Sequence, residues 1–264
     1  MTQRFGILAF PAKHSLSPVM HNAAFQALDI DAEYGFFEIP PEDLDPFMIE
    51  ARQSIAGLSV SVPYKEAILK YLDEISPEAE KIWAVNTILN RNGRLSGFNT
   101  DFIGSNKALE EVCDLKGKTV VVLGAGGSAR AIIYGILEAG GRVLVKNRTQ
   151  DKAEKLAEEF GVKIAEWEAL DQADILINTT SVWLENPDAQ PFFCKPEYLD
   201  NFKIVMDIFY KPLITPLLKE ASKLGKTIVT GEKMLVFQAA EQFKIWTGRE
   251  APVEVMKKAI IDCA

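Results

Sequence analysis

Short apolar runs alternate with amphipathic stretches along almost the whole chain. A short apolar run indicates a strand, and a longer stretch with apolar residues every three or four positions indicates a helix. In the first part of the chain, the pattern predicts helices over 17–28 and 41–53. It also predicts strands over 5–10, 34–39, 55–60, 84–90 and 94–98. The last two strands flank Asn92-Gly93, a turn pair that is typical of a hairpin.

The alternation is sharper after residue 118. Residues 119–123 form a continuous Val-rich run, as expected of a strand buried on both faces. The pattern then predicts strands over 142–146, 162–165, 174–178, 204–208 and 227–229. It predicts helices over 127–139, 150–160, 215–224, 234–246 and 253–261. Strand–helix alternation of this kind predicts an α/β fold with mostly parallel sheets.

The length of 264 residues suits either one large α/β domain or two smaller ones. One expected boundary lies at 99–101, before the helix that leads to the Val-rich strand. A second lies near Gly231, where the predicted strands end. The expected organisation is therefore a first domain of residues 1–101 and 232–264, with the last helices returning to it, and a second domain of residues 102–231.

A glycine-rich turn follows the Val-rich strand. Gly124-Ala125-Gly126-Gly127 ends that strand and opens a helix, with Ala129 at the expected close helix–strand contact. This is a variant of the dinucleotide fingerprint, in which the glycines permit a tight turn and a close approach to a pyrophosphate. The helix N-terminus would offer free N–H groups to the phosphates. The sequence therefore predicts a Rossmann-type, dinucleotide-binding domain.

The end of the next strand bears on the choice of cofactor. NAD-binding units usually carry Asp or Glu there, for the ribose hydroxyls. This chain has Asn147-Arg148-Thr149 instead, with Lys152 one turn further on. Because the Arg guanidinium suits a phosphate group, this pattern favours NADP over NAD. The alternative is that Arg148 and Lys152 are ordinary surface charges.

A second group of polar residues lies in the first domain. Ser15 and Ser17 precede a helix that has Pro18 at its start, where Ser17 could be an N-cap or the two hydroxyls could hold a carboxylate. Lys65 follows the predicted strand 55–60, at the strand end where α/β proteins usually bind ligands. Asp101 ends another segment and could equally be the first charge of its helix.

Composition excludes several classes of protein. With 29 Lys and Arg against 37 Asp and Glu, the net charge of −8 argues against a nucleic-acid partner. Two histidines and three widely spaced cysteines argue against a metal site and a disulfide framework, and suit a reducing cytoplasm. No segment has the pattern of a signal peptide or of a membrane span, so we expect no membrane partner.

The chain resembles the shikimate dehydrogenase family. The resemblance rests on motifs that recur in order and with matching spacing over nearly the whole sequence. They are His14-Ser15-Leu16-Ser17-Pro18 with His21-Asn22, Lys65 after Pro63, Ala84-Val85-Asn86-Thr87, Asn99-Thr100-Asp101, the glycine turn, Asn147-Arg148-Thr149, Asn178-Thr179-Thr180, Asp207 with Tyr210, Thr215-Pro216-Leu217-Leu218, and Gly231 with Gln238-Ala239.

The resemblance implies NADPH-dependent reduction of 3-dehydroshikimate to shikimate, in the biosynthesis of aromatic amino acids. The first domain would then bind substrate and the second NADP. Lys65 and Asp101 would be the catalytic pair. The implied substrate-binding residues are Ser15, Ser17, Ser61, Asn86, Tyr210 and Gln238. The implied cofactor-binding residues are Gly124, Ala125, Gly126, Gly127, Asn147, Arg148, Thr149, Lys152, Thr179 and Gly231, with no metal ligand. A homodimer is a further expectation.

Two positions depart from the family pattern. Ser59 stands where the family usually has Asn, and Trp183 where it has Gly, in a loop expected to border the nicotinamide. We expect the surrounding segment, 182–196, to be mobile. The departures leave two alternatives open: a quinate/shikimate dehydrogenase with NAD use, and a non-catalytic protein that senses NADP or shikimate.

Overall fold

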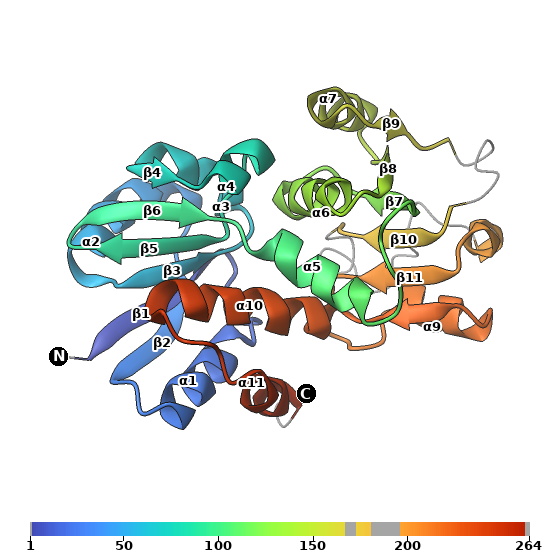
Figure 1. Cartoon of the computed structure of the whole chain (residues 1–264). Coiled ribbons are helices and arrows are strands. Elements are labelled where there is room, and N and C mark those ends of the chain that lie inside the picture. The colour runs from blue at the N-terminus through green and yellow to red at the C-terminus, as the bar shows by residue number, and fades with distance from the viewer. Residues whose placement is uncertain (1, 167–172, 181–195, 262–264) are drawn as a thin grey trace. The chain divides into compact units, whose positions relative to one another are not determined.

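A computed structural model describes residues 2–166, 173–180 and 196–261 (Figure 1). Trp183 and almost all of the segment expected to be mobile lie outside these residues. The chain divides into two compact units, of which the first comprises Met1–Thr100 and Val236–Ala264 and the second Asp101–Leu235. Each unit contains one six-stranded sheet with helices beside it, so the α/β fold is confirmed. Within the described ranges, no helix is both long and apolar enough to cross a membrane.

The sheet of the first unit has the strand order β2-β1-β3-β5-β6-β4. Its strands are β1 (Gln3–Ala9), β2 (Ala32–Glu38), β3 (Gly57–Val60), β4 (Glu74–Ile75), β5 (Thr87–Arg91) and β6 (Arg94–Phe98). Strands β1, β2 and β3 are parallel, whereas β5 runs antiparallel to both β3 and β6. The predicted hairpin joins β5 and β6, with Asn92 and Gly93 both at positive φ, as a two-residue hairpin turn requires.

Helices cover both faces of this sheet. They are α1 (Ser17–Ala27), α2 (Leu44–Ser54), α3 (Tyr64–Ala67), α4 (Pro77–Ile82), most of α10 (Gly231–Thr247) and α11 (Val253–Ile261), with short 3-10 turns η1 (Pro41–Asp43) and η2 (Ile68–Tyr71). On one face, Leu58 and Val60 of β3 pack with residues of α2 to α4. On the other, Phe5 of β1 contacts Phe25 of α1 and Trp246 of α10. Figure 1 shows α1 and α10 beside β1 and β2.

The second unit has a fully parallel sheet in the order β12-β11-β10-β7-β8-β9. Its strands are β7 (Thr119–Leu123), β8 (Arg142–Lys146), β9 (Lys163–Ile164), β10 (Ile175–Asn178), β11 (Ile204–Asp207) and β12 (Thr227–Val229). Because the chain enters at the central β7, moves outward on one side and then returns to the other, this is the Rossmann strand order. All four residues 120–123 are fully buried, as the Val-rich run predicted.

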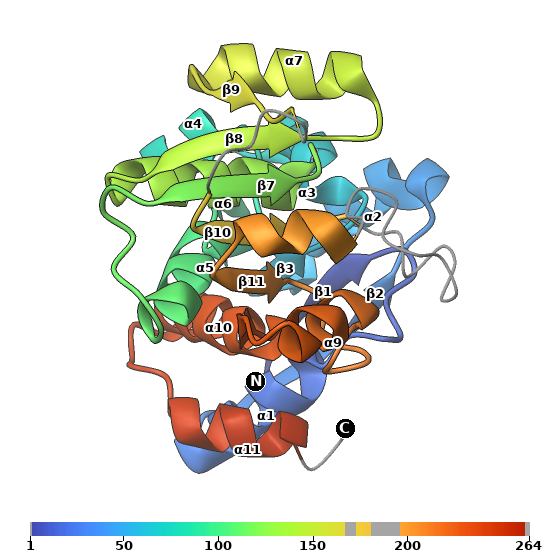
Figure 2. The ribbon, with the colours of Figure 1, turned by 90° about the vertical axis from the view of Figure 1, so that its right-hand side faces the viewer.

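The helices of the second unit are α5 (Asp101–Glu110), α6 (Gly127–Glu138), α7 (Gln150–Phe160) and α9 (Pro216–Lys223), with a 3-10 turn η4 (Pro196–Asn201). Helix α6 packs on β7 and β8 and also against α5. Helix α9 lies beside β11 (Figure 2) and also packs on β12. The reversal of strand order falls between β7 and β10, so the crevice typical of nucleotide binding is expected at the carboxyl ends of these two strands.

Candidate functional site

Ser15 and Ser17 lie at the start of α1, after the carboxyl end of β1. The prediction that Ser17 is an N-cap is wrong, because the N-cap is Leu16 and no side chain caps the helix. Instead, Ser15 Oγ donates to Ser17 Oγ over 3.1 Å and accepts from the backbone N–H of Ser17 over 3.2 Å. The two hydroxyls therefore lie together at an uncapped helix N-terminus, where a carboxylate would be stabilised.

Asn86 is the centre of a buried polar cluster just before β5. Its Oδ1 accepts from the backbone N–H of Thr100 at 2.8 Å and from Thr87 Oγ1 at 2.7 Å. Its Nδ2 donates to Thr100 Oγ1 at 2.9 Å and to Gln238 Oε1 at 3.3 Å. The structure thus brings together two predicted substrate-binding residues, Asn86 and Gln238, that are far apart in the sequence.

Ser61 and Lys65 follow the carboxyl end of β3. The carbonyl of Ser61 accepts from the N–H of Tyr64, which starts the short helix α3. The carbonyl of Lys65 accepts from the N–H of Val85 at 2.8 Å, so the backbone of Lys65 lies beside the segment that carries Asn86. The side chain of Lys65 is half-buried. Backbone pairing therefore gathers Ser61, Lys65 and Asn86 at one edge of the first sheet.

Asp101 is the first residue of α5 and is 4% exposed. It begins the second unit, whereas Lys65 belongs to the first. Its place at the start of a helix also fits the alternative that its charge stabilises that helix. The catalytic pairing of Lys65 with Asp101 stays a prediction.

The glycine turn in the second unit has a clear steric basis. Gly124 has φ +117°, and a Cβ there would collide with the Thr179 hydroxyl. That hydroxyl donates to the carbonyl of Leu123 at 2.7 Å, which fixes β10 against the end of β7. Thr179 therefore has a structural role beside the predicted one in cofactor binding.

Gly126 differs from Gly124. Its φ of −97° suits any residue, and a Cβ would meet no atom of the described residues within 4 Å. It is the N-cap of α6, which has no side-chain cap and no acidic residue in its first turn. Space beside an uncapped helix N-terminus is what a pyrophosphate requires. The residues at this turn therefore fit a dinucleotide.

The end of β8 carries the predicted ribose-phosphate site. Asn147 Nδ2 donates to the carbonyl of Thr149 at 2.9 Å, which holds the loop in a turn. Arg148, Thr149 and Lys152 are exposed. Within the described part of the chain, neither Arg148 nor Lys152 forms an ion pair. Their charges are therefore available to a phosphate.

Gly231 and Tyr210 lie near the end of β11. Gly231 is the first residue of α10, and a Cβ there would collide with the carbonyl of Ile208. Only glycine allows this close approach, so its role in the fold is steric. Tyr210 follows β11 and is half-buried.

The carboxyl end of β11 also holds a buried acid. Asp207 is fully buried and accepts from Asn178 Nδ2, from Thr215 Oγ1 at 2.7 Å and from the N–H of Phe209. Burial raises the pKa of Asp207 to about 6, and the three donors oppose part of that rise. The carboxyl group ties β10, β11 and the start of α9 together.

Sequence reasoning singled out Ser59 but missed the buried residues Tyr34 and Gln242, which connect it to Asn86. Tyr34, Ser59 and Gln242 form hydrogen bonds that lead to the carbonyl of Asn86. One signal was present in the sequence: Gln242 lies four residues after Gln238, and therefore on the same face of α10.

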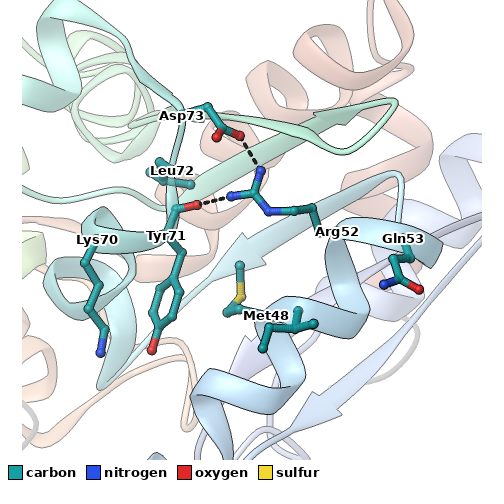
Figure 3. A pocket seen from close by; sticks show the side chains of 8 residues that line it. Met48, Arg52, Gln53, Lys70, Tyr71, Leu72 and Asp73 are labelled. Carbon is teal, nitrogen blue, oxygen red and sulfur yellow. Dashed lines mark hydrogen bonds and ion pairs between the residues drawn. The ribbon is translucent and has the colours of Figure 1, made fainter.

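A surface pocket in the first unit contains none of the predicted site residues. It is lined by Met48, Ile49, Arg52, Gln53, Lys70, Tyr71, Leu72 and Asp73 (Figure 3). Arg52 donates to Asp73 Oδ2 at 2.5 Å and to the carbonyls of Tyr71 and Gly93, both at 2.7 Å. These bonds tie α2 to the β5–β6 hairpin, which gives Arg52 a structural role.

Together, the strand order, the glycine turn and the polar edge of the first sheet define a two-unit α/β protein of the Rossmann dinucleotide-binding class. Three family models match the chain. They are the shikimate dehydrogenase substrate-binding domain over residues 7–88, shikimate/quinate 5-dehydrogenase over 106–190, and the shikimate 5'-dehydrogenase C-terminal domain over 231–261. The chain belongs to the shikimate dehydrogenase family, as the sequence motifs predicted.

Individual relatives match over nearly their full length. The shikimate dehydrogenase (NADP(+)) of Methanococcoides burtonii is 44% identical, with 99% of this chain and 98% of the relative covered. That of Thermococcus kodakarensis is 43% identical over 99% and 97%. A crystal structure of the Thermus thermophilus enzyme in complex with NADP(H) and shikimate is 41% identical, with a TM-score of 0.93 over 99% of this chain and all of that chain.

Proposed function

We propose that this protein catalyses the reversible, NADPH-dependent reduction of 3-dehydroshikimate to shikimate, a step in the biosynthesis of aromatic amino acids. The observation that supports this proposal is that one chain of this family carries both a cluster of polar residues in its first unit and a glycine turn at a helix N-terminus in its second. The first unit gathers Ser61, Lys65, Asn86 and Gln238 at one sheet edge, and the second presents an uncapped glycine turn. NADPH, when bound, supplies the hydride.

The roles of the substrate-binding residues follow from their chemistry. Ser15 and Ser17 would hold the substrate carboxylate at the N-terminus of α1. Ser61, Asn86 and Gln238 would bind the ring hydroxyls, with Tyr210 nearby. Lys65 would deliver the proton to the oxygen of the reduced carbonyl, and Asp101 would orient Lys65 and one hydroxyl.

The roles in the second unit follow from charge and space. Gly124, Ala125, Gly126 and Gly127 would admit the pyrophosphate, and Thr179 and Gly231 would line the cofactor site. Asn147, Arg148, Thr149 and Lys152 would hold the phosphate that distinguishes NADP from NAD. Support comes from the exposed Arg148 and Lys152, whose charges no described acid neutralises.

We also propose that the two parts of the chain bind different ligands: residues 1–101 and 232–264 bind substrate, and residues 102–231 bind the cofactor.

We also propose a homodimer in the cytoplasm. Edge strand β2 supports the dimer, since its Phe36 is 46% exposed. Light scattering coupled to size exclusion would test the dimer, and a single peak at the monomer mass would contradict it.

A four-way assay tests the activity. Purified protein is mixed with shikimate or quinate and with NADP or NAD, and the absorbance of the reduced nicotinamide is followed. We expect the highest kcat/KM for shikimate with NADP. A preference for quinate with NAD would indicate the quinate/shikimate variant, and calorimetric binding of shikimate without turnover would indicate a sensor.

A further inference from the structure

Four buried residues of the first unit form a continuous chain of hydrogen bonds. Tyr34 Oη donates to Ser59 Oγ at 2.6 Å, and Ser59 Oγ donates to Gln242 Oε1 at 2.9 Å. Gln242 Nε2 then donates to the carbonyl of Asn86 at 3.0 Å. Tyr34, Ser59, Asn86 and Gln242 are all at most 5% exposed. The chain therefore runs from β2 through β3 and α10 to the residue that leads into β5.

In this series of hydrogen bonds, each residue donates to the next, from Tyr34 towards Asn86. Because Ser59 Oγ accepts from Tyr34, its own proton is directed to Gln242 Oε1. With its oxygen engaged there, the Gln242 amide can only present its NH₂ group to Asn86. Such aligned hydrogen bonds polarise one another in a buried environment. The Tyr34 hydroxyl thus fixes the orientation of an amide that it does not touch.

The spacing of hydrogen-bonding side chains along α10 matches the spacing of the backbone carbonyls at Asn86 and Ile88. Gln242 donates to the carbonyl of Asn86, and Trp246 Nε1 donates to the carbonyl of Ile88 at 2.9 Å. Four residues of a helix rise about 6 Å, and two residues of a strand rise about 6.6 Å. One turn before Gln242, Gln238 Oε1 accepts from Asn86 Nδ2. The helix therefore contacts Asn86 twice, once at its backbone and once at its side chain.

We propose that Tyr34, Ser59 and Gln242 are positioning residues that set the affinity for the substrate's ring hydroxyls, by fixing the backbone of Asn86 and the carboxamides of Asn86 and Gln238. This inference rests on the proposed function. The hydrogen bonds to the oxygens of the Asn86 and Gln238 carboxamides fix which end of each carboxamide is a donor. Asn86 Oδ1 is occupied by Thr100 and Thr87, and Gln238 Oε1 by Asn86. A shift of the Asn86 backbone would move both amides together.

The proposal also accounts for Ser59, which departs from the family pattern. The Ser59 hydroxyl bonds to Gln242 and not to the carboxamides of Asn86 and Gln238. Tyr34 and Gln242 on either side of it complete the path, and their hydroxyl and amide satisfy both hydrogen-bonding directions of the serine. The departure is therefore compatible with an intact substrate site.

The test compares the KM for shikimate with the KM for NADP in four variants. Tyr34→Phe and Ser59→Ala each remove one hydroxyl from the chain, and Ser59→Thr keeps it. Trp246→Phe is the control, since it removes a different buried hydrogen bond of α10, the one to the carbonyl of Ile88, and leaves the Tyr34–Ser59–Gln242 bonds in place. Shikimate oxidation is followed with NADP, and a urea titration of each variant confirms that it is folded at the assay temperature.

For Tyr34→Phe and Ser59→Ala we expect the KM for shikimate to rise about 3- to 10-fold, the range for loss of one buried hydrogen bond. The KM for NADP is expected to stay within about twofold, and Ser59→Thr and Trp246→Phe are expected to keep the wild-type KM for shikimate. Equal rises in Ser59→Ala and Ser59→Thr, or in Trp246→Phe, would overturn the inference. So would an unchanged KM in Tyr34→Phe and Ser59→Ala while the wild type is active. A wild type that does not oxidise shikimate would instead overturn the proposed function, and the inference with it.

Discussion

His21 is a fully buried side chain that lies between aromatic rings. Its ring stacks on Tyr34 with 4.6 Å between centroids and is also close to Trp246 and Phe25. Among the described groups, none forms a hydrogen bond with either ring nitrogen. Burial lowers the pKa of His21 to about 3, and the nearby Gln242 side chain opposes only part of that shift. The residue is therefore neutral in the folded protein at physiological pH.

This burial predicts a pH-dependent stability. The unfolded chain binds a proton on His21 below about pH 6.5, whereas the folded protein does so only near pH 3. His21 therefore does not lower the free energy of unfolding above pH 6.5. Between pH 6.5 and pH 3, the free energy of unfolding falls by about 1.4 kcal/mol per pH unit as the pH is lowered. In His21→Phe we expect the loss between pH 7 and pH 5 to shrink by about 2 kcal/mol. Urea titrations at both pH values measure this, with exposed His14→Gln as the control. An unchanged pH dependence in His21→Phe would contradict the assignment.

Lys65 carries the proposed proton transfer. Lys65→Met keeps most of the side-chain length but removes the ammonium group. We expect kcat to fall about 10²- to 10⁴-fold, the usual contribution of a positioned acid, while the urea midpoint stays near that of the wild type. Steady-state kinetics of shikimate oxidation measure the change. Substitution of Lys70, which pairs with Asp45 at the surface, is the control. A fall in kcat of less than about tenfold for Lys65→Met would remove Lys65 from this role.

In the glycine turn, we expect Gly124 to be needed for the fold and Gly126 for binding of the cofactor. Gly124→Ala forces a Cβ into the Thr179 hydroxyl at a positive φ, so we expect the free energy of unfolding to fall by about 2 kcal/mol or more. Gly126→Ala places its methyl group where no atom of the described part of the chain lies within 4 Å. We expect its stability to change little while the KM for NADP rises at least about tenfold, because the methyl group would occupy the phosphate position.

Urea unfolding and the KM values for NADP and shikimate, measured on both glycine variants, decide this. If Gly126→Ala binds NADP like the wild type, the pyrophosphate does not lie at this turn. If Gly124→Ala is as stable as the wild type, the steric argument at Thr179 is wrong.

Helix α9 begins with a cap that is linked to a buried charge. Thr215 Oγ1 accepts from the N–H of Leu218 and donates to Asp207. Because the folded-state pKa of Asp207 is raised to about 6, its contribution to stability is greatest below pH 4 and is lost as the pH rises through 6. Removing the Thr215 donor should therefore cost more where Asp207 is ionised.

For Thr215→Val we expect a loss of about 2–4 kcal/mol at pH 8, from the cap and from a hydrogen bond to a charged group. At pH 5 we expect about 1 kcal/mol less, since Asp207 is then mostly protonated. Urea titrations at the two pH values measure both, with Thr227→Val on β12 as the control. Equal losses at pH 5 and pH 8 would contradict the link to Asp207.

The long periodic elements could be predicted from the sequence, and the short ones could not. The predicted boundaries of β7, β8, α7 and α11 agree with the structure. By contrast, residues 64–82 contain two short helices, a 3-10 turn and the two-residue strand β4, none of which was predicted. Elements of this length have too few residues to show a period, and they form because Tyr64, Ile68 and Ala79 are buried against the sheet. The N-cap alternative for Ser17 is wrong for a related reason: residue type favours a cap, but the backbone conformation decides it.

The site shows the same limit at longer range. Motifs identified Asn86 and Gln238 separately, but their contact spans 152 residues and depends on the return of α10 to the first sheet. The hydrogen bonds among Tyr34, Ser59 and Gln242 were not visible in the sequence, because the three residues come from separate elements and only Ser59 falls in a recognised motif. Residue types can suggest which residues belong to a site, whereas tertiary packing decides which of them are in contact.

For the whole molecule, net charge and local charge give different information. The chain carries −8, yet the proposed ligands are a carboxylate and a phosphate-rich cofactor. Exposed Arg148 and Lys152 reconcile the two, because at physiological salt a ligand responds to charges within about 8 Å and not to the net charge. An acidic protein can therefore bind anions through a small basic site.

We expect Arg148 to decide the preference for NADP over NAD. Arg148→Gln removes the guanidinium but keeps a polar side chain. If Arg148 binds the phosphate that NAD lacks, the KM for NADP should rise about 10- to 100-fold, the range for a lost charge-assisted pair, while the KM for NAD and for shikimate changes less than about twofold. The Lys152→Gln variant should show the same direction with a smaller effect, and Arg142→Gln at the opposite end of β8 should show none. Raising the salt concentration should weaken NADP binding in the wild type more than in Arg148→Gln. If NADP and NAD were affected equally, Arg148 would contribute to the turn and not to the choice between the two cofactors.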